Sequence, residues 1–213
     1  MHIDHVAMLV PDASQATAEL RRRHGLGAER GMFYECAGTR HWFVPLESPQ
    51  GLELLEIEDR EAALSGPDGQ AVLDCEARGF GLFSWCVLVD DLERVSQLLR
   101  SPIFDYTVPQ PDGTVRGWRT VSGPRHLPFF IDYPNNGDRP GRFREMYERV
   151  RHESAPTSFS ELTISGDPQE HLEWLGPNDL PLRFEAGQQG IVEARIATGR
   201  GQAIIRSDNS AAE

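Results

Sequence analysis

The chain has 213 residues, of which 39% are hydrophobic, and a formal net charge of −12 at pH 7. This length is enough to bury a core as one domain or as two closely packed halves. A strongly acidic surface repels polyanions, which argues against nucleic acid as a partner. No apolar run has the length of a membrane span, and the N-terminus starts a strand instead of a signal peptide. We therefore expect a cytoplasmic protein with no membrane partner.

The three cysteines are Cys36, Cys75 and Cys86, and none is separated from another by the two residues of a zinc-ligand or redox pair. Their apolar or small neighbours predict buried free thiols rather than a disulfide framework or a structural zinc site. The two glycines Gly79 and Gly81 precede a strand instead of a helix, so they do not form a dinucleotide fingerprint. Since the P-loop and the serine-hydrolase elbow are also missing, nucleotide cofactors and serine-hydrolase chemistry are not expected.

A strand that runs into a helix through an aspartate occurs three times along the chain. In each case Gln or Glu follows the aspartate by three residues, which is the spacing of a capping box. The repetition predicts three units that each begin with a strand and a helix. The pairs are Asp12 with Gln15, Asp90 with Glu93, and Asp167 with Glu170.

The first unit covers residues 1–58 and has the predicted order β-α-β-β-β. Alternating or continuous apolar runs predict its strands, and a helical pattern that ends at Gly25 and Gly27 predicts its helix. Residues 59–79 are polar and small, which indicates a linker with one short helix near residues 60–64. The predicted strands cover residues 3–10, 32–36, 40–46 and 51–57, and the helix covers residues 13–24.

The second unit covers residues 80–135 and is predicted as β-α-β-β. Its helix has Leu92, Val95, Leu98 and Leu99 on one face, which favours packing against a sheet. A connecting loop and helix (136–156), a third β-α-β-β-β-like unit (157–206) and a frayed tail (207–213) follow. The strands of the second unit are expected at residues 80–89, 114–122 and 127–133.

Several of these segments resemble one superfamily of proteins. His5 stands in an Asp-His-Val opening strand, and Glu53 stands in a Leu-Glu-Leu closing strand. Together with the β-α-β-β-β repeat, they resemble the vicinal oxygen chelate superfamily, and more narrowly the glyoxalase-like domain proteins. The narrower resemblance depends on four segments: Gly38-Thr39 before Val44-Pro45-Leu46, Gly51-Leu52-Glu53-Leu54, Pro111-Asp112-Gly113 with Arg116-Gly117-Trp118-Arg119, and Leu127 to Asp132.

The resemblance implies an α+β fold in which two units form a half-open, cup-shaped mixed β-sheet. In that superfamily the cup holds a divalent metal, with ligands from the first and last strands of each unit. Here the resemblance implies His5 and Glu53 as ligands, because adjacent opening and closing strands can present both to one face. Imidazole and carboxylate suit zinc, iron, manganese or nickel. A polar contact at His5 and a solvated Glu53 are the alternative.

The second and third units do not supply an equivalent histidine. Aligning their aspartate junctions with the first unit places Ser84 and Ser160 at the position of His5. A site with two histidines and a carboxylate therefore needs another donor, and His41, His126 and Asp132 are the candidates. A surface turn for His126 and a turn-starting role for Asp132 are the alternatives.

The expected pocket lies between the first two units. Aromatic strand residues suit a flat or apolar ligand, and an inward arginine would bind a carboxylate or enolate oxygen. Plain core for the aromatics and solvated charge for the arginine remain the alternatives. The candidate substrate-binding residues are His41, Trp118, Arg119 and Phe130, and the candidate catalytic residues are Glu53 and Asp132.

These residues predict a protein that binds a small organic molecule. As an enzyme, it would carry out the lyase, isomerase or dioxygenase chemistry of the superfamily with one divalent metal, with Glu53 as ligand or base. The alternatives are a metal-free cup that binds or sequesters a flat ligand, and a scaffold whose cup has become core. The sequence leaves the substrate and a homodimer open.

Overall fold

The computed structural model describes residues 1–109, 115–134 and 139–207. The predicted frayed tail lies, apart from Ser207, outside these residues, as do parts of the loops around residues 112 and 137. The chain forms six helices and twelve strands within the described residues. The strands are β1 (His2–Leu9), β2 (Glu29–Tyr34), β3 (Thr39–Pro45), β4 (Gly51–Ile57), β5 (Gly81–Leu88), β6 (Ile103–Pro109), β7 (Val115–Val121), β8 (Phe129–Asp132), β9 (Pro156–Ser165), β10 (Leu182–Glu185), β11 (Gly190–Thr198) and β12 (Gly201–Arg206). The helices are α1 (Ala13–His24), α2 (Arg60–Ser65), α3 (Gly69–Ala77), α4 (Leu92–Leu99), α5 (Arg139–Arg149) and α6 (Pro168–Leu175).

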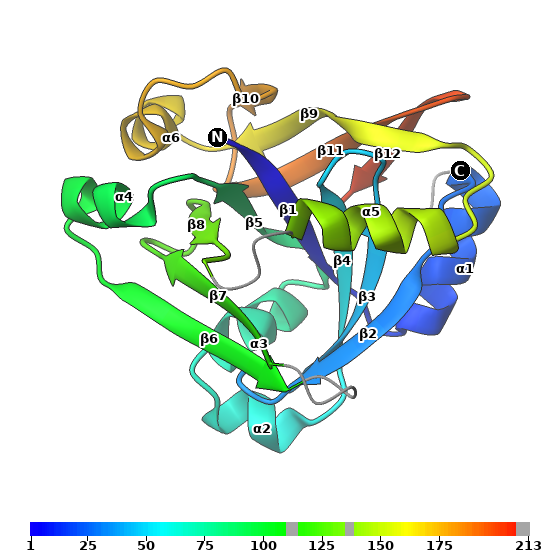
Figure 1. The fold of residues 1–213 in the computed structure, drawn as a ribbon, viewed down its shortest axis with the longest axis horizontal. Helices are drawn as coiled ribbons and strands as arrows, with labels where there is room; N and C mark the ends of the chain where they lie inside the picture. Colours follow the sequence, from blue (N-terminus) through cyan, green and yellow to red (C-terminus); the bar gives the residue numbers. More distant parts are fainter. Residues whose placement is uncertain (110–114, 135–138, 208–213) are drawn as a thin grey trace.

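Eight strands form one curled mixed sheet, in the order β2-β3-β4-β1-β5-β8-β7-β6. Within each half, the first strand lies parallel to the last: β1 pairs with β4, and β5 pairs with β8. The two halves meet where β1 and β5 pair antiparallel in the centre of the sheet. Figure 1 shows the strands of this sheet curving round to form an open half-barrel, which confirms the predicted α+β fold with a half-open cup.

The second half has one strand more than the sequence predicts. β6 is an edge strand that pairs only with β7, and its sequence alternates polar and apolar residues between two prolines. The second unit is therefore β-α-β-β-β rather than β-α-β-β. A second helix, α3, also replaces part of the predicted linker, where Val72 and Cys75 are buried.

The last segment forms a separate sheet of four strands, in the order β10-β9-β11-β12. Its element order matches that of the first unit, but its strand pairing differs. The strand after the helix, β10, lies parallel to β9, whereas in the first unit the last strand has that place. The segment therefore completes its own sheet and adds no strand to the cup.

The main core lies on the convex side of the eight-stranded sheet. Side chains of β1, β4 and β5 pack there against α1, α4 and the inner face of the four-stranded sheet, and Val6, Leu54, Phe159 and Ile196 are among its buried members. On the concave side, α3 packs against Ala7 and Leu55, and Met146 of α5 packs on Phe43. The convex face is thus filled, which leaves the concave face for a cavity.

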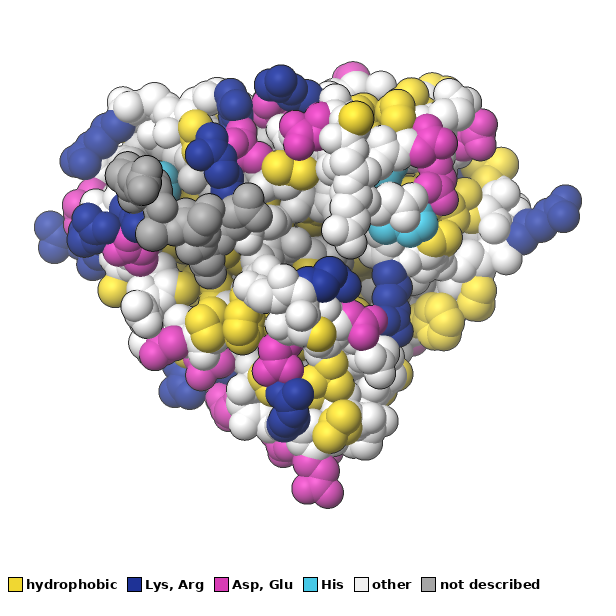
Figure 2. All heavy atoms as spheres, turned by 180° about the vertical axis from the view of Figure 1, so that it is seen from behind, with side chains coloured by type: hydrophobic (Ala, Val, Ile, Leu, Met, Phe, Trp, Pro, Cys, Tyr) yellow, Lys and Arg dark blue, Asp and Glu magenta, His cyan; other side chains and the backbone are white. Residues whose placement is uncertain are grey.

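Charged side chains of both signs occur on the face opposite that of Figure 1. There, acidic and basic residues are interspersed with hydrophobic ones and do not gather in one region (Figure 2). Among the described residues, no helix combines the length and the apolar character needed to cross a membrane.

Candidate functional site

A cavity of about 740 Å³ lies on the concave face of the eight-stranded sheet. This volume is in the range of sites for small organic molecules. Both halves of the sheet contribute to its wall, and α3 and the segment before β11 close parts of its rim. The residues used below that line it are His5, Tyr34, Cys36, His41, Glu53, Asp68, Ser84, Tyr106, Trp118, His126, Phe129 and Tyr133.

The alternation of side chains along each strand decides which residues reach the cavity. On β7, Trp118 and Thr120 face the cavity, whereas Arg119 between them faces the other side. On β8, Phe129 and Ile131 face the cavity. Because β1 and β4 run parallel side by side, with Ala7 opposite Glu53, His5 and Glu53 reach the same space.

Glu53 is the centre of the polar end of the cavity. Its Oε2 atom lies 3.8 Å from His5 Nε2 and 3.3 Å from His41 Nδ1. All three side chains are buried, with residue exposures between 7% and 9%. The structure therefore brings together the two predicted ligands and one of the three candidates for another donor.

The turn before β3 positions His41. Gly38 has φ +64°, a conformation that favours glycine, and a Cβ atom there would lie 2.2 Å from the Asp59 carbonyl oxygen. The Gly38 carbonyl accepts hydrogen bonds from the backbone N–H groups of Glu58 and Asp59. Next in the chain, the buried Thr39 hydroxyl is hydrogen-bonded to His41 Nε2 at 3.1 Å. This contact leaves His41 Nδ1 directed at Glu53.

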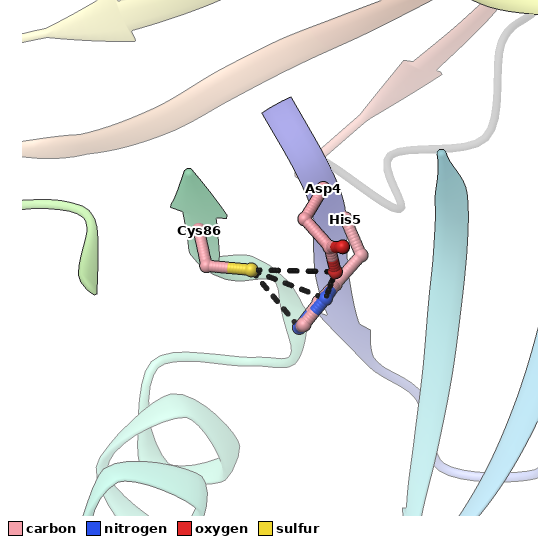
Figure 3. Close-up of side chains that lie close together, drawn as sticks. All are labelled: Asp4, His5 and Cys86. Atoms are coloured by element: carbon pink, nitrogen blue, oxygen red, sulfur yellow. Dashed lines mark hydrogen bonds and ion pairs between the residues drawn. The ribbon is translucent and has the colours of Figure 1, made fainter. Parts of the chain in front are cut away.

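A β-bulge shapes the strand that carries His5. In β1, Ile3 pairs with Val87 and His5 pairs with Cys86, so that Asp4 is an extra residue between two consecutive partners. Neighbouring residues of a regular strand point to opposite faces, and the bulge removes that constraint. As a result, Asp4 Oδ2 lies 2.7 Å from His5 Nδ1, and the Cys86 sulfur lies 3.1 Å from the same nitrogen (Figure 3).

Two sets of side chains have the chemistry of a divalent metal site. One consists of Asp4, His5 and Cys86, whose ligand atoms all lie within 4.8 Å of one another. However, 2.7 Å is a hydrogen-bonding distance, whereas two ligands about 2 Å from one tetrahedral ion lie about 3.3 Å apart. The other set consists of His5 Nε2, His41 Nδ1 and Glu53. His41 Nδ1 is buried without a hydrogen bond among the described residues, and an ion would satisfy it. This second set contains the two predicted ligands, and its imidazole and carboxylate groups are ordinary ligands of a divalent metal.

A second polar group lines the cavity away from Glu53. Asp68 begins α3 but does not cap it, because its carboxyl group is hydrogen-bonded by Cys36 and Tyr106. Burial raises the pKa of the Asp68 carboxyl above its usual value, and it raises the pKa of the Cys36 thiol to about 11. The Cys36 thiol is therefore neutral near pH 7 and donates a hydrogen bond rather than acting as a nucleophile.

Three predicted site residues lie outside the cavity wall. The Arg119 guanidinium donates to both carboxylate oxygens of Asp132, at 3.0 and 2.5 Å, and also to Glu93 of α4. Phe130 is buried in the convex core against Trp174, with ring centroids 5.9 Å apart. Of the seven predicted residues, the cavity thus contains His5, His41, Glu53 and Trp118. Their roles in binding and catalysis remain predictions.

The other residues considered from the sequence are His126, Ser84 and Arg116. His126 lines the cavity at its rim, where its Nε2 lies 2.9 Å from Glu170 of α6. Ser84 also lines the cavity, as the alignment of the two halves implies. The side chain of Arg116 lies outside the described part of the chain.

Sequence reasoning did not identify several polar residues near the cavity. In a regular strand, Asp4 would point to the face of the sheet opposite to that of His5, and only the bulge brings the two side chains together. Tyr34, Tyr106 and Tyr133 line the cavity from β2, β6 and the end of β8. The Trp118 ring is stacked on Tyr106, with centroids 5.4 Å apart and planes 2° apart. Tyr106 gave no signal because β6 was not predicted, whereas Tyr34 and Tyr133 lie in predicted strands and were not among the predicted site residues.

Comparison with known proteins supports the fold. Residues 3–179 match the family model of the glyoxalase-like domain. A hypothetical protein from Staphylococcus aureus has 12% identity and a TM-score of 0.67, with 95% of this chain and 98% of that chain covered. Methylmalonyl-CoA epimerase from Streptomyces coelicolor has 14% identity and a TM-score of 0.47, with 63% and 98% covered. No curated protein matches the sequence. The chain belongs to the glyoxalase-like domain family.

Proposed function

We propose that this protein binds a small organic molecule in the cavity and acts on it with a divalent metal held by His5, His41 and Glu53. The observation that supports this is the convergence of two buried imidazole nitrogens on Glu53 Oε2, at 3.8 and 3.3 Å. Neutral imidazole and carboxylate are ordinary ligands of zinc, iron, manganese and nickel. The chemistry of the donor set and the unsatisfied His41 Nδ1 both favour an ion at this end of the cavity.

The walls of the cavity favour a flat, largely apolar ligand. Trp118 and Tyr106 form a stacked pair on one side, and the Tyr34 ring lies 4.1 Å from the His41 ring, centroid to centroid. Such rings bind flat molecules by contact area and stacking. They also exclude water from Glu53, which strengthens its interaction with charge that develops on the ligand.

The reaction class that suits this site is a lyase or isomerase reaction with a proton transfer next to a carbonyl group. When bound, a divalent metal supplies a Lewis acid that polarises the carbonyl or enolate oxygen. His5 and His41 orient the group that they hold. The second Glu53 oxygen is the carboxylate atom in position to take or return the proton.

Glu53→Gln tests the proposal, because it keeps the size of the side chain and removes its charge. We expect about one metal ion per chain in the wild-type protein, purified without chelators and measured by plasma mass spectrometry, and a loss of at least tenfold in the variant. Glu56→Gln is the matched control: Glu56 lies on the same strand but faces α1, where it accepts from the Ala13 N–H. An equal loss in both variants, or full metal content in Glu53→Gln, would contradict the metal site.

One observation favours a second function, in which the cavity binds or sequesters a ligand without a metal. The second half of the sheet contributes Ser84, Phe129 and Ile131 where the first half has His5 and Glu53, and these are poor metal ligands. Stacking on Trp118 would then account for binding. Under this alternative the wild-type protein, Glu53→Gln and Glu56→Gln all lack metal. A flat aromatic probe such as 1-anilinonaphthalene-8-sulfonate then changes its fluorescence with the wild-type protein, and Trp118→Ala abolishes this change.

A further inference from the structure

We infer that Asp4 is a positioning residue that fixes the proton of His5 on Nδ1 and so presents the bare Nε2 atom to the cavity. The inference deepens the proposed function, which needs His5 Nε2 as a ligand or acceptor. The inference concerns the contact of His5 Nδ1 with Asp4, whereas the other ring nitrogen, Nε2, faces Glu53. The sequence motif assigns no role to Asp4, because a regular strand would direct it to the opposite face.

The contacts of Asp4 are those of a hydrogen-bond acceptor. Its Oδ2 atom lies 2.7 Å from His5 Nδ1, 3.8 Å from the Cys86 sulfur and 3.3 Å from the Tyr133 hydroxyl. A ring N–H, a thiol and a phenol are all able to donate to a carboxylate oxygen. Asp4 is only 1% exposed, so its side chain depends on such donors rather than on water.

This arrangement decides where the proton of a neutral His5 ring resides. A proton on Nδ1 forms a short, charge-assisted hydrogen bond to Asp4. A proton on Nε2 would place the bare Nδ1 lone pair 2.7 Å from a carboxylate oxygen, which is repulsive. The Cys86 sulfur, 3.1 Å from Nδ1, is a weak acceptor and does not replace Asp4. The tautomer with the proton on Nδ1 therefore prevails.

The consequence lies at the other end of the ring. His5 Nε2 faces Glu53 Oε2 at 3.8 Å, on the wall of the cavity. A carboxylate on the second nitrogen of a ligating histidine fixes the orientation of the ring and raises its basicity, and loss of such partners costs about 10- to 100-fold in metal affinity. The Asp4 bulge between β1 and β5 thus connects the central strand pair with the site (Figure 3).

The test is the tautomer of His5, read from long-range 1H–15N correlation spectra of protein labelled with 15N-histidine, in alkaline buffer with chelator. Spectra of His5→Gln assign the signals. We expect wild-type His5 with the proton on Nδ1, and a shift toward the tautomer with the proton on Nε2 in Asp4→Leu, which keeps the size of the side chain and removes the acceptor. Cys86→Ala and Tyr133→Phe are the matched controls, since each removes one neighbour of Asp4 and keeps the acceptor, and both should keep the wild-type tautomer.

A wild-type spectrum with the proton on Nε2 would overturn the inference, as would an Asp4→Leu spectrum that keeps the proton on Nδ1. Zinc titration of the same samples reports on the proposed function separately. We expect Asp4→Leu to weaken zinc binding by about 10- to 100-fold relative to Tyr133→Phe. If the wild-type protein binds no zinc while the tautomer responds as expected, the metal proposal fails and the role of Asp4 stands.

Discussion

At the scale of single residues, neighbouring positions on one strand have different tasks. Trp118 and Arg119 are adjacent on β7, yet Trp118 lines the cavity and Arg119 binds Asp132 and Glu93 on the outer side. The pairing raises the pKa of the Arg119 guanidinium, chiefly through its hydrogen bonds to Asp132. Arg119 and Asp132 therefore connect β7, β8 and α4 and do not contact the cavity.

This geometry predicts that Asp132 acts on stability. Asp132→Ala leaves the Arg119 guanidinium without its bidentate acceptor, and should lower the free energy of unfolding by about 1 to 3 kcal/mol. Urea denaturation measures this change, and metal content should stay at the wild-type level. Asp179→Ala, at an exposed position between α6 and β10, is the control and should change neither quantity. Loss of metal with unchanged stability would instead give Asp132 a role in the site.

At the scale of elements, the aspartates before the helices do not all act as the repeat predicts. Asp12 accepts from the Gln15 N–H and begins α1, as expected. In the second unit, Asp91 rather than Asp90 begins α4 and accepts from the Arg94 N–H at 2.8 Å. The predicted pairing of Asp90 with Glu93 is wrong by one residue, because two adjacent aspartates offer the same signal and only the backbone selects between them.

The difference between the two aspartates is measurable. Asp91→Ala should destabilise the protein by about 1 kcal/mol, the usual cost of a lost N-cap, because α4 carries the buried Leu92 into the core. Asp90→Ala should change the free energy of unfolding by a few tenths of a kcal/mol at most. The comparison requires chemical denaturation of both variants in parallel. Equal effects would mean that the cap observed at Asp91 contributes nothing of its own.

At the scale of the whole molecule, a short segment connects the cup with the four-stranded sheet. After α5, the chain passes the end of α1, where His152 Nδ1 accepts from the Gly27 N–H and the Glu153 N–H donates to the Gly25 carbonyl. Burial, aided by the nearby Arg21 charge, lowers the pKa of His152 from 6.5 to about 4. The neutral ring is therefore part of the folded state.

The lowered pKa predicts a loss of stability in mild acid. Between pH 6.5 and about pH 4 the unfolded chain binds a proton at His152 that the folded chain does not, so stability falls as the pH falls through this window. Above pH 6.5 the contribution is constant. His152→Gln still accepts from Gly27 and cannot be protonated, so its melting temperature should fall less steeply in this window. The same slope in both proteins would show that His152 does not control acid stability. His2 and His24, whose pKa values are also lowered, contribute to the slope that remains.

The sequence by itself determined most of the strands of the cup. Apolar periodicity and the repeated junction predict these strands, whereas the cup shape and the choice of His5 and Glu53 followed from the resemblance to the superfamily. These signals are local, because alternation along one strand is enough to predict which residues share a face. β6 was not predicted although its sequence alternates, since it is a short edge strand between two prolines and its side chains are largely exposed.

Only the tertiary structure decided what surrounds Glu53. His41 meets it because β3 pairs with β4, which a single strand does not reveal. Asp4 joins His5 because β1 gains one residue against β5, and such a bulge depends on the pairing of two distant segments. The last segment has the same order of helix and strands as each half of the cup, but it forms its own sheet. The order of strands in a sheet depends on long-range packing rather than on local sequence pattern.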